Sequence, residues 1–221
     1  MDEHHRPAYR ARLLMGVAWV VLLLGLWLWG QEVTAVRLNI SAPVSGDVAA
    51  VGRPQQVRLP SSVRPLGDAL PQRLDIPALG VQAPVVARGL DPRGAIDPPP
   101  FERAGAVGWY AAGVRPGAPG AALLVGHADT ETGPAVFHRL AALTPGALVR
   151  VLRDDGKLAE FTVEHVQVVD RARFDARQAY GPHRAGRAEL RLLTCGGTFD
   201  RAAGTYTANV IVSAYLTGTG L

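Results

Sequence analysis

The stretch Leu190–Arg201 reads LRLLTCGGTFDR and contains the only cysteine of the 221-residue chain. Its first half is apolar and predicts a β-strand. Alternate residues of a strand point to the same face, so Arg191, Leu193 and Cys195 are expected to lie together on one face. The two glycines after Cys195 predict that the strand ends there and that the thiol faces a cleft. Because free cysteine is often buried, a structural thiol is the alternative interpretation.

A second stretch, Leu123–Thr130, reads LLVGHADT and has a similar pattern. Alternation predicts that Leu123, Val125 and His127 share a face, with His127 at the end of an apolar strand. The glycine before His127 permits close approach of another backbone segment. Of the six histidines in the chain, His127 alone closes an apolar strand as Cys195 does. An ordinary surface histidine is the alternative interpretation.

Further short runs of alternating or β-branched residues surround these two stretches and predict an all-β barrel or sandwich. The expected strands are Arg73–Pro77, Val81–Leu90, Ala121–His127, Ala147–Asp154, Leu158–Asp170, Glu189–Cys195 and Thr207–Leu216. Asp155-Gly156 is expected to form the turn of a hairpin. Helical signal is weak, and Ala135–Leu143 is the one segment that predicts a short helix of two turns.

The N-terminal part of the chain has a different character. Eighteen uncharged residues, Leu13 to Gly30, are long enough for a transmembrane helix. Arginines before this span predict a cytoplasmic N-terminus and an extracellular remainder by the positive-inside rule. A cleaved signal peptide is the alternative, but the apolar core is longer than is typical. We therefore expect a cytoplasmic N-terminus (1–12), a transmembrane signal-anchor (13–30), an extracellular linker (31–70) and a folded domain (71–221).

Charge and motif content exclude several classes of function. The net charge is +4, and the 22 arginines and single lysine are spread along the chain, so no nucleic-acid-binding face is predicted. One cysteine and dispersed histidines give no ligand spacing for a metal site. The sequence contains no dedicated acidic cluster that would indicate a calcium-binding site. Phosphate-binding and dinucleotide-binding glycine motifs are absent from the sequence, so no cofactor is expected.

Cysteine and histidine together are the minimal set for catalysis by a thiol nucleophile. A thiolate attacks a carbonyl carbon, and an imidazolium protonates the leaving amine. A cation is also needed to stabilise the oxyanion or to position the substrate. Arg201 is the only lysine or arginine after Cys195 and is expected in the loop that follows the cysteine strand.

These blocks together resemble the sortases, which are membrane-anchored cysteine transpeptidases of Gram-positive cell surfaces. Thr194-Cys195 matches the threonine-cysteine pair of the sortase signature, although Arg191 replaces its leading threonine. The segments RLDIPALGVQAPVV (73–86), VGWY (107–110), TGPAVFHRL (132–140) and TCGG-FDR (194–201) are similar to class F sortases of actinobacteria. The resemblance covers about Pro71 to Leu216.

The resemblance implies an eight-stranded sortase-type β-barrel with short helices, in which Cys195, His127 and Arg201 converge on a groove. It implies a protein substrate with a C-terminal LPxTG-like sorting signal, which the thiolate cleaves between threonine and glycine. An amine acceptor, such as a peptidoglycan precursor, then resolves the acyl-enzyme. Asp129 is a candidate to orient His127, and Thr194 is a candidate to support the groove; a solvated carboxylate and an ordinary strand residue are the alternatives.

Two other functions remain open on the sequence alone. The first is a thiol hydrolase that releases surface proteins. An added amine distinguishes it from a transpeptidase, because the hydrolase forms no ligated product with the amine. The second is an anchored binding module with a vestigial thiol, which predicts a Cys195 without enhanced reactivity. The L,D-transpeptidases are also exported cysteine enzymes, but their histidine and cysteine lie close together in sequence, unlike His127 and Cys195.

Overall fold

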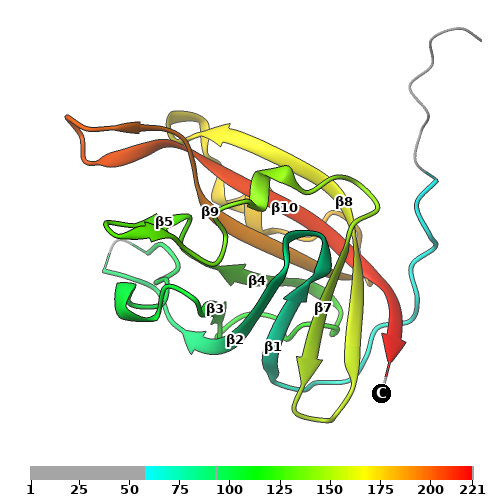
Figure 1. Cartoon of the computed structure of the whole chain (residues 1–221). Helices are drawn as coiled ribbons and strands as arrows, with labels where there is room; N and C mark the ends of the chain where they lie inside the picture. The colour runs from blue at the N-terminus through cyan, green and yellow to red at the C-terminus, as the bar shows by residue number, and fades with distance from the viewer. Residues whose placement is uncertain (1–57, 93, 221) are drawn as a thin grey trace, which may run out of the picture. The chain divides into compact units, whose positions relative to one another are not determined.

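The computed structural model of the chain describes residues 58–92 and 94–220 (Figure 1). The predicted cytoplasmic N-terminus, transmembrane span and first part of the linker lie outside these residues. None of the helices within the described residues has both the length and the apolar character needed to cross a membrane.

Eight strands close into a barrel, which confirms the predicted all-β class and strand number. Their order around the barrel is β1-β2-β3-β4-β9-β10-β8-β7. The bounds are β1 Pro71–Ile76, β2 Val81–Arg88, β3 Val107–Tyr110, β4 Gly120–Val125, β7 Leu148–Arg153, β8 Leu158–Asp170, β9 Ala188–Asp200 and β10 Thr205–Gly220. Two pairs, β2 with β3 and β4 with β9, are parallel, and the other pairs are antiparallel.

Alternation along β9 divides its side chains between the barrel interior and the outer face. Leu190 and Leu192 are fully buried in the main hydrophobic core. Leu193 belongs instead to a second apolar cluster on the outer face. Each buried leucine contributes about 1.5–3 kcal/mol of transfer free energy, so this pattern fixes which face of β9 carries Cys195.

The hairpin between β7 and β8 forms as predicted, with Asp155 and Gly156 in its turn. Gly156 has φ +77°, a conformation that glycine adopts without strain. Its N–H donates to the Arg153 carbonyl at 3.1 Å, and Arg153 N–H donates to the Lys157 carbonyl at 3.0 Å. The sequence prediction for this connection is therefore confirmed.

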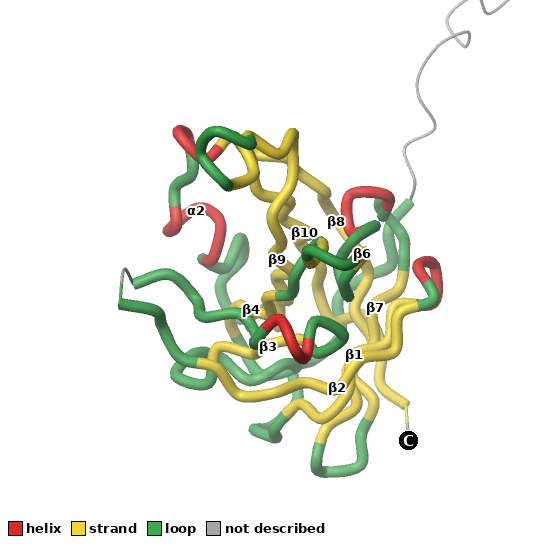
Figure 2. The backbone as a smooth tube through the Cα atoms, turned by 60° about the vertical axis from the view of Figure 1, so that its left-hand side comes forward, coloured by secondary structure: helices red, strands yellow, loops and turns green. Residues whose placement is uncertain are grey.

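Within residues 58–92 and 94–220, helices occupy only short connections between strands (Figure 2). They are the 3-10 turns η1 Pro77–Leu79, η2 Phe101–Arg103, η3 Leu140–Ala142 and η4 Arg171–Arg173, and the α-helix α2 Ala176–Tyr180. The sequence analysis missed α2, which begins at an Asp175 cap that accepts from the Arg177 N–H at 2.8 Å.

The predicted two-turn helix at Ala135–Leu143 is wrong, and the hydrogen bonding gives the reason. The N–H groups of Ala135 and Phe137 donate to the carbonyls of Ala128 and His127 instead of starting a helix. The bonds that follow, such as Leu140 N–H to the Phe137 carbonyl, span three residues and leave only η3. This segment therefore supports the backbone around His127.

Strand β9 also departs from the prediction, because it does not end at Cys195. It continues to Asp200 and pairs with β10 up to Thr205. The register of this pairing shifts at Gly197, which has φ +77° and whose missing Cβ would lie 2.5 Å from the Thr207 hydroxyl. The two glycines thus form a bulge rather than a strand end. The β9–β10 hairpin extends past the rest of the barrel in Figure 1.

The segment before β1 packs along the barrel, although it falls within the predicted linker. Val63 N–H donates to the Leu216 carbonyl at 3.1 Å, and Leu66 N–H donates to the Gly117 carbonyl at 2.7 Å. The hydroxyl of Tyr215 donates to the Pro60 carbonyl at 2.6 Å. Residues from Pro60 onward therefore contribute contacts to the folded domain.

Candidate active site

Strands β4 and β9 bring the two predicted catalytic residues side by side. The strands are parallel, and Val125 is paired with Leu193. His127 and Cys195 each follow these paired residues by two positions. β4 ends at Val125, so His127 lies in the segment that follows it, whereas Cys195 is still within β9. Their equal spacing from the paired residues places both at the same end of this strand pair.

Thr194 and Gly126 fasten the two strands together just before the catalytic residues. The buried Thr194 hydroxyl donates to the Gly126 carbonyl at 2.8 Å, and Gly126 N–H donates to the Leu193 carbonyl at 3.1 Å. A Cβ at position 126 would lie 2.7 Å from side-chain carbons of Phe137 and Val136. The sequence predicted that another backbone segment approaches this glycine, whereas the groups that lie against it are the side chains of Val136 and Phe137. The Thr194 hydroxyl supports the site through its bond to the Gly126 carbonyl.

The His127 ring is held by the connection between β2 and β3. Its Nε2 lies 2.6 Å from the Pro99 carbonyl oxygen, so the ring donates Nε2–H there. Phe101 stacks on the ring with centroids 4.3 Å apart and an interplanar angle of 24°. In this arrangement Nδ1 carries the free lone pair of a neutral imidazole. The sequence analysis gave no signal for either contact.

Among the described residues, no hydrogen bond or ion pair joins Asp129 to His127. It begins the short strand β5 (Asp129–Thr130), which pairs with β6 (Gly133–Pro134). Its carboxylate accepts a short hydrogen bond from the hydroxyl of Tyr206 on β10. This bond raises the pKa of Tyr206 above its ordinary value of 10.0. Asp129 therefore joins the segment after His127 to the β9–β10 hairpin, a link that the sequence analysis missed.

Cys195 is exposed to solvent, as a nucleophile must be. Protein atoms packed around one side of the thiol desolvate the thiolate and raise its pKa above the ordinary 9.0. The positive charge of Arg171 opposes this effect, and the negative charge of Asp129 adds to it. The free protein therefore keeps Cys195 mainly as the thiol at neutral pH.

Arg201 lies in the exposed turn between β9 and β10, so its predicted place in that connection is confirmed. The turn follows Asp200, five residues along β9 from Cys195. Five residues of a strand span about 16 Å, so the hairpin carries Arg201 away from the thiol. Arg171, which the sequence analysis did not select, is the arginine whose charge acts on Cys195.

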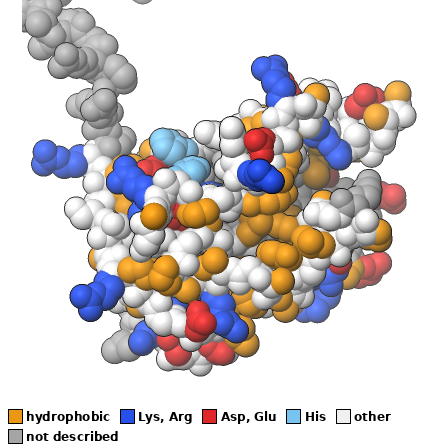
Figure 3. Space-filling view, turned by 180° about the vertical axis from the view of Figure 1, so that it is seen from behind, with side chains coloured by type: hydrophobic (Ala, Val, Ile, Leu, Met, Phe, Trp, Pro, Cys, Tyr) orange, Lys and Arg blue, Asp and Glu red, His pale blue; other side chains and the backbone are white. Residues whose placement is uncertain are grey.

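A second apolar cluster of buried side chains lies on the outer face of the barrel, next to the two candidate catalytic residues in sequence. It consists of Ile96, Leu123, Val125, Ala179, Leu193 and Ile211. A hollow of about 60 Å³ lies beside it, and its lining combines apolar residues such as Val169 and Phe174 with polar residues such as Gln167 and Ser213. Figure 3 shows hydrophobic side chains gathered across the middle of the molecule when it is seen from behind.

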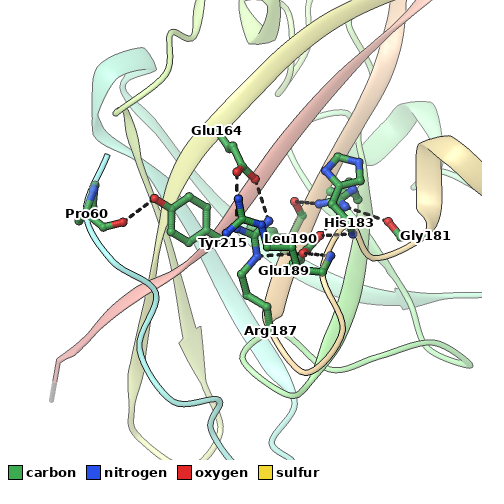
Figure 4. Close-up of polar contacts among 10 residues, drawn as sticks. Pro60, Glu164, Gly181, His183, Arg187, Glu189, Leu190 and Tyr215 are labelled. Carbon is green, nitrogen blue, oxygen red and sulfur yellow. Dashed lines mark hydrogen bonds and ion pairs between the residues drawn. The ribbon is translucent and has the colours of Figure 1, made fainter. Parts of the chain in front are cut away.

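A buried ionic network fixes the connection between α2 and β9 (Figure 4). Glu189 accepts from the backbone N–H groups of His183 and Arg184, each at 2.9 Å. It also pairs with Arg187 at 2.9 Å and with Arg191 at 2.5 Å. Burial alone would raise the pKa of Glu189, but these hydrogen bonds hold it below its ordinary 4.5.

This network explains why Arg191, which was predicted on the same face as Cys195, is not available to the active site. The Arg191 side chain is fully buried and committed to Glu189 and to the Gly181 carbonyl, at 2.8 Å. The sequence signal for this pair was the presence of two opposite charges, Glu189 and Arg191, two positions apart within the apolar start of β9.

Across residues 58–92 and 94–220, no cluster of three histidine, cysteine, aspartate or glutamate side chains is arranged to hold a metal ion.

Comparison with known proteins agrees with this geometry. Residues 74–217 match the family model for the sortase domain, which is most of the chain. The chain therefore belongs to the sortase family, whose members are cysteine transpeptidases acting on proteins with LPxTG-type sorting signals and on amine acceptors. Among curated protein sequences, none matches the chain significantly.

Solved structures of sortases share the fold at low sequence identity. The SrtA sortase from Actinomyces oris is 20% identical with a TM-score of 0.52, covering 73% of this chain and 86% of that one. A lid mutant of sortase A from Corynebacterium diphtheriae is 15% identical with a TM-score of 0.51, covering 69% and 73%. Sortase C-1 from Actinomyces oris is 21% identical with a TM-score of 0.50, covering 66% and 73%.

Proposed function

We propose that this chain is a class F sortase that is anchored in the cell membrane by residues 13–30. Its catalytic domain is extracellular and cleaves an LPxTG-like sorting signal between threonine and glycine. It then transfers the acyl group to the amine of a cell-wall precursor. The class assignment rests on the sequence blocks around His127 and Cys195, and the anchor rests on the apolar N-terminal span.

The observation that carries this proposal is the register of the parallel strands β4 and β9, in which Val125 pairs with Leu193, so that His127 and Cys195 each follow the paired residues by two positions. A thiol nucleophile and an imidazole at the same end of two neighbouring strands form the pair that thioester chemistry needs. The exposure of Cys195 gives a peptide carbonyl access to the sulfur.

In the first half of the reaction, Nδ1 of His127 takes the proton of the Cys195 thiol, and the resulting thiolate attacks the carbonyl carbon of the substrate threonine. The tetrahedral intermediate collapses, the C–N bond to glycine breaks, and His127 gives its proton to the leaving amine. A thioester on Cys195 results. In the second half, His127 takes a proton from the attacking amine, the new amide bond forms, and the Cys195 thiolate leaves.

Arg201 is proposed to stabilise the oxyanion or to hold a backbone carbonyl of the substrate. The planar fork of guanidinium donors suits either task. For this role the β9–β10 hairpin has to bend toward the thiol when substrate binds, because the turn is distant from Cys195 in the free protein.

The sorting signal is proposed to bind along the outer face of the barrel beside Cys195. The apolar cluster on that face is buried, so it supports the site from beneath. The hollow beside the cluster has a largely polar lining, with Gln167 and Ser213 next to Val169, and is the candidate to receive a polar part of the substrate. A peptide along this face presents its threonine–glycine bond to Cys195. The buried network around Glu189 fixes the connection between α2 and β9.

The proposal is tested by incubating the full-length protein in detergent with an LPxTG-like peptide, with and without an added amine such as triglycine. A transpeptidase yields a ligated product whose amount rises with the amine concentration. Release of the free threonine carboxylate alone, unaffected by the amine, indicates the hydrolase alternative. A peptide that binds and stays intact indicates a binding module. The anchor is tested separately by membrane fractionation of cells that carry the full chain or a chain without residues 13–30.

A further inference from the structure

Three consecutive prolines, Pro98 to Pro100, lie beside the His127 ring in the connection between β2 and β3. Proline nitrogens carry no hydrogen, so this segment offers its surroundings only carbonyl oxygens. Pro99 is buried close to β3, where a Cβ at Gly108 would lie 3.2 Å from the proline Cδ. A buried carbonyl needs a donor, and His127 supplies one, because its Nε2 lies 2.6 Å from the Pro99 oxygen.

The proline segment is anchored on both sides. Asp97, directly before it, forms a short ion pair with Arg88 of β2. After it, η2 is joined to the segment that follows β6, because the Val136 N–H donates to the Ala104 carbonyl at 3.0 Å. The φ angles of the prolines are also fixed by their rings. The carbonyl that faces the imidazole is therefore held in a defined place.

Two contacts restrict different rotations of the His127 ring. Phe101 stacks on the ring with centroids 4.3 Å apart and an interplanar angle of 24°, which opposes tilting out of this plane. Stacking alone permits a half-turn about the Cβ–Cγ bond, because the flipped ring keeps the same plane. That flip would place Cε1 opposite the Pro99 carbonyl and break the hydrogen bond from Nε2. The stack and the bond together therefore select one orientation and one tautomer, in which Nδ1 is free.

Phe101 contributes little to the hydrophobic core. It is 64% exposed, although its side chain is large and apolar. Among the residues that the structure describes, neither apolar cluster includes it. Loss of the Phe101 ring is therefore expected to affect the imidazole more than the stability of the barrel.

We propose that Phe101 is a positioning residue for His127. Its ring and the Pro99 carbonyl hold the imidazole so that Nδ1 is the nitrogen that accepts and releases the proton of the reaction. Nε2 keeps its hydrogen at the carbonyl throughout. This inference rests on the proposed role of His127 as the general acid and base. Phe101 acts through the imidazole and takes no part in the bonds that form and break.

The first readout is the tautomer of His127, which does not depend on turnover. The full-length protein with isotope-labelled histidine is studied in detergent by long-range proton–nitrogen correlation, at a pH above the titration of the ring. We expect the Nε2–H tautomer alone in the wild type and a mixture of tautomers in Phe101→Ala. Phe101→Leu, which keeps apolar bulk without a flat ring, is expected to behave like Phe101→Ala, and Phe101→Tyr like the wild type.

The second readout is the cleavage of an LPxTG-like peptide. Aromatic stacking is a modest interaction, so Phe101→Ala is expected to lower kcat about two- to tenfold and to leave KM within about twofold. Phe101→Tyr retains the stack and most of the rate. The matched control is Leu90→Ala, which removes another exposed apolar side chain from the same connection and leaves both the tautomer and kcat in place.

The Nε2–H tautomer alone in both Phe101→Ala and Phe101→Leu overturns the proposal, and so does an Nδ1–H tautomer in the wild type. A raised KM at unchanged kcat also overturns it, because that result makes Phe101 a substrate contact. An equal change in Leu90→Ala counts against it as well. If Phe101→Ala does not fold, Phe101→Leu decides. If the wild type cleaves no peptide, the proposed transpeptidase fails, and the tautomer still decides this inference.

Discussion

The Thr194 hydroxyl donates to the Gly126 carbonyl at 2.8 Å, which ties β9 to β4 one residue before Cys195 and one residue before His127. Since parallel strands can slip relative to one another, this buried bond fixes the register on which the catalytic pair depends. Gly126 is part of the same arrangement, because a side chain at this position would clash with the side chains of Val136 and Phe137.

Removal of the Thr194 hydroxyl therefore affects both stability and rate. Thr194→Val leaves the buried Gly126 carbonyl without its donor, and we expect a loss of about 1–3 kcal/mol in the free energy of unfolding. We also expect a lower kcat, since the catalytic pair is less well held. Thr194→Ser keeps the hydroxyl and is the control. Denaturant unfolding and peptide cleavage measure both effects, and equal behaviour of the two variants counts against the proposed tie.

His127 is expected to dominate the pH dependence of catalysis. His127→Ala lowers the cleavage rate far more than the control substitutions His138→Ala, His165→Ala and His183→Ala. In the wild type, kcat/KM follows a bell-shaped profile that belongs to the coupled thiol–imidazole pair. Because burial raises the thiol pKa above 9.0, the alkaline limb lies above the ordinary thiol range. Similar losses in all four variants remove the reason for assigning His127.

The barrel and the position of the catalytic pair could be predicted because both depend on local pattern. Alternation in two apolar strands placed His127 and Cys195 on matching faces, and the aspartate–glycine turn fixed a hairpin. The end of β9 was predicted wrongly because glycine pairs are common both at strand ends and in bulges. Only the pairing of Gly196 with Ala208 on β10, followed by the register shift at Gly197, distinguishes the two.

Contacts between distant segments were beyond the reach of sequence patterns. The bond from Tyr206 to Asp129 joins residues 77 positions apart, and Arg171 reaches Thr205 across 34 positions. The Pro99 carbonyl that accepts from His127 belongs to a loop without any periodicity. Each of these contacts requires the closed barrel, so local propensity carries no information about them. Arg201 was selected because it follows Cys195 in sequence, whereas Arg171 lies in η4, 24 positions before Cys195.

Glu189 is expected to be the main acid-sensitive group of the α2 connection. Its pKa is lowered in the folded protein, so its stabilising contribution is present above 4.5 and is lost as the pH falls through the folded-state value. Glu189→Gln breaks the buried pairs with Arg187 and Arg191 at a cost of about 3–5 kcal/mol at pH 7. Glu160→Gln, which affects a partly exposed pair with Arg150, is the control.

The measurement for Glu189 is the unfolding temperature between pH 7 and pH 3. The wild type loses stability over the lower part of this range, and Glu189→Gln starts lower and depends less on pH there. Parallel curves for the two proteins contradict an ionised Glu189 at the centre of the network.

The N-terminal boundary of the domain is tested by truncation. Removal of residues 1–57 is expected to leave a soluble and active domain, because the contacts described for the barrel begin at Pro60. Removal of residues 1–70 eliminates the bonds to Tyr215, Leu216 and Gly117 and is expected to lower the unfolding temperature. Thermal unfolding of the two truncated chains provides the comparison, and equal unfolding temperatures contradict a structural role for this segment.

The central claim is that Cys195 forms a thioester with the sorting signal, and intact-protein mass spectrometry tests it most directly. The full-length protein is mixed with an LPxTG-like peptide in the absence of amine and quenched in acid. We predict a mass increase equal to the acyl part of the peptide, located on Cys195 and discharged by added triglycine. Cys195→Ala is expected to fold normally and to gain no mass. Peptide cleavage by Cys195→Ala, or an adduct at another residue, would contradict the account.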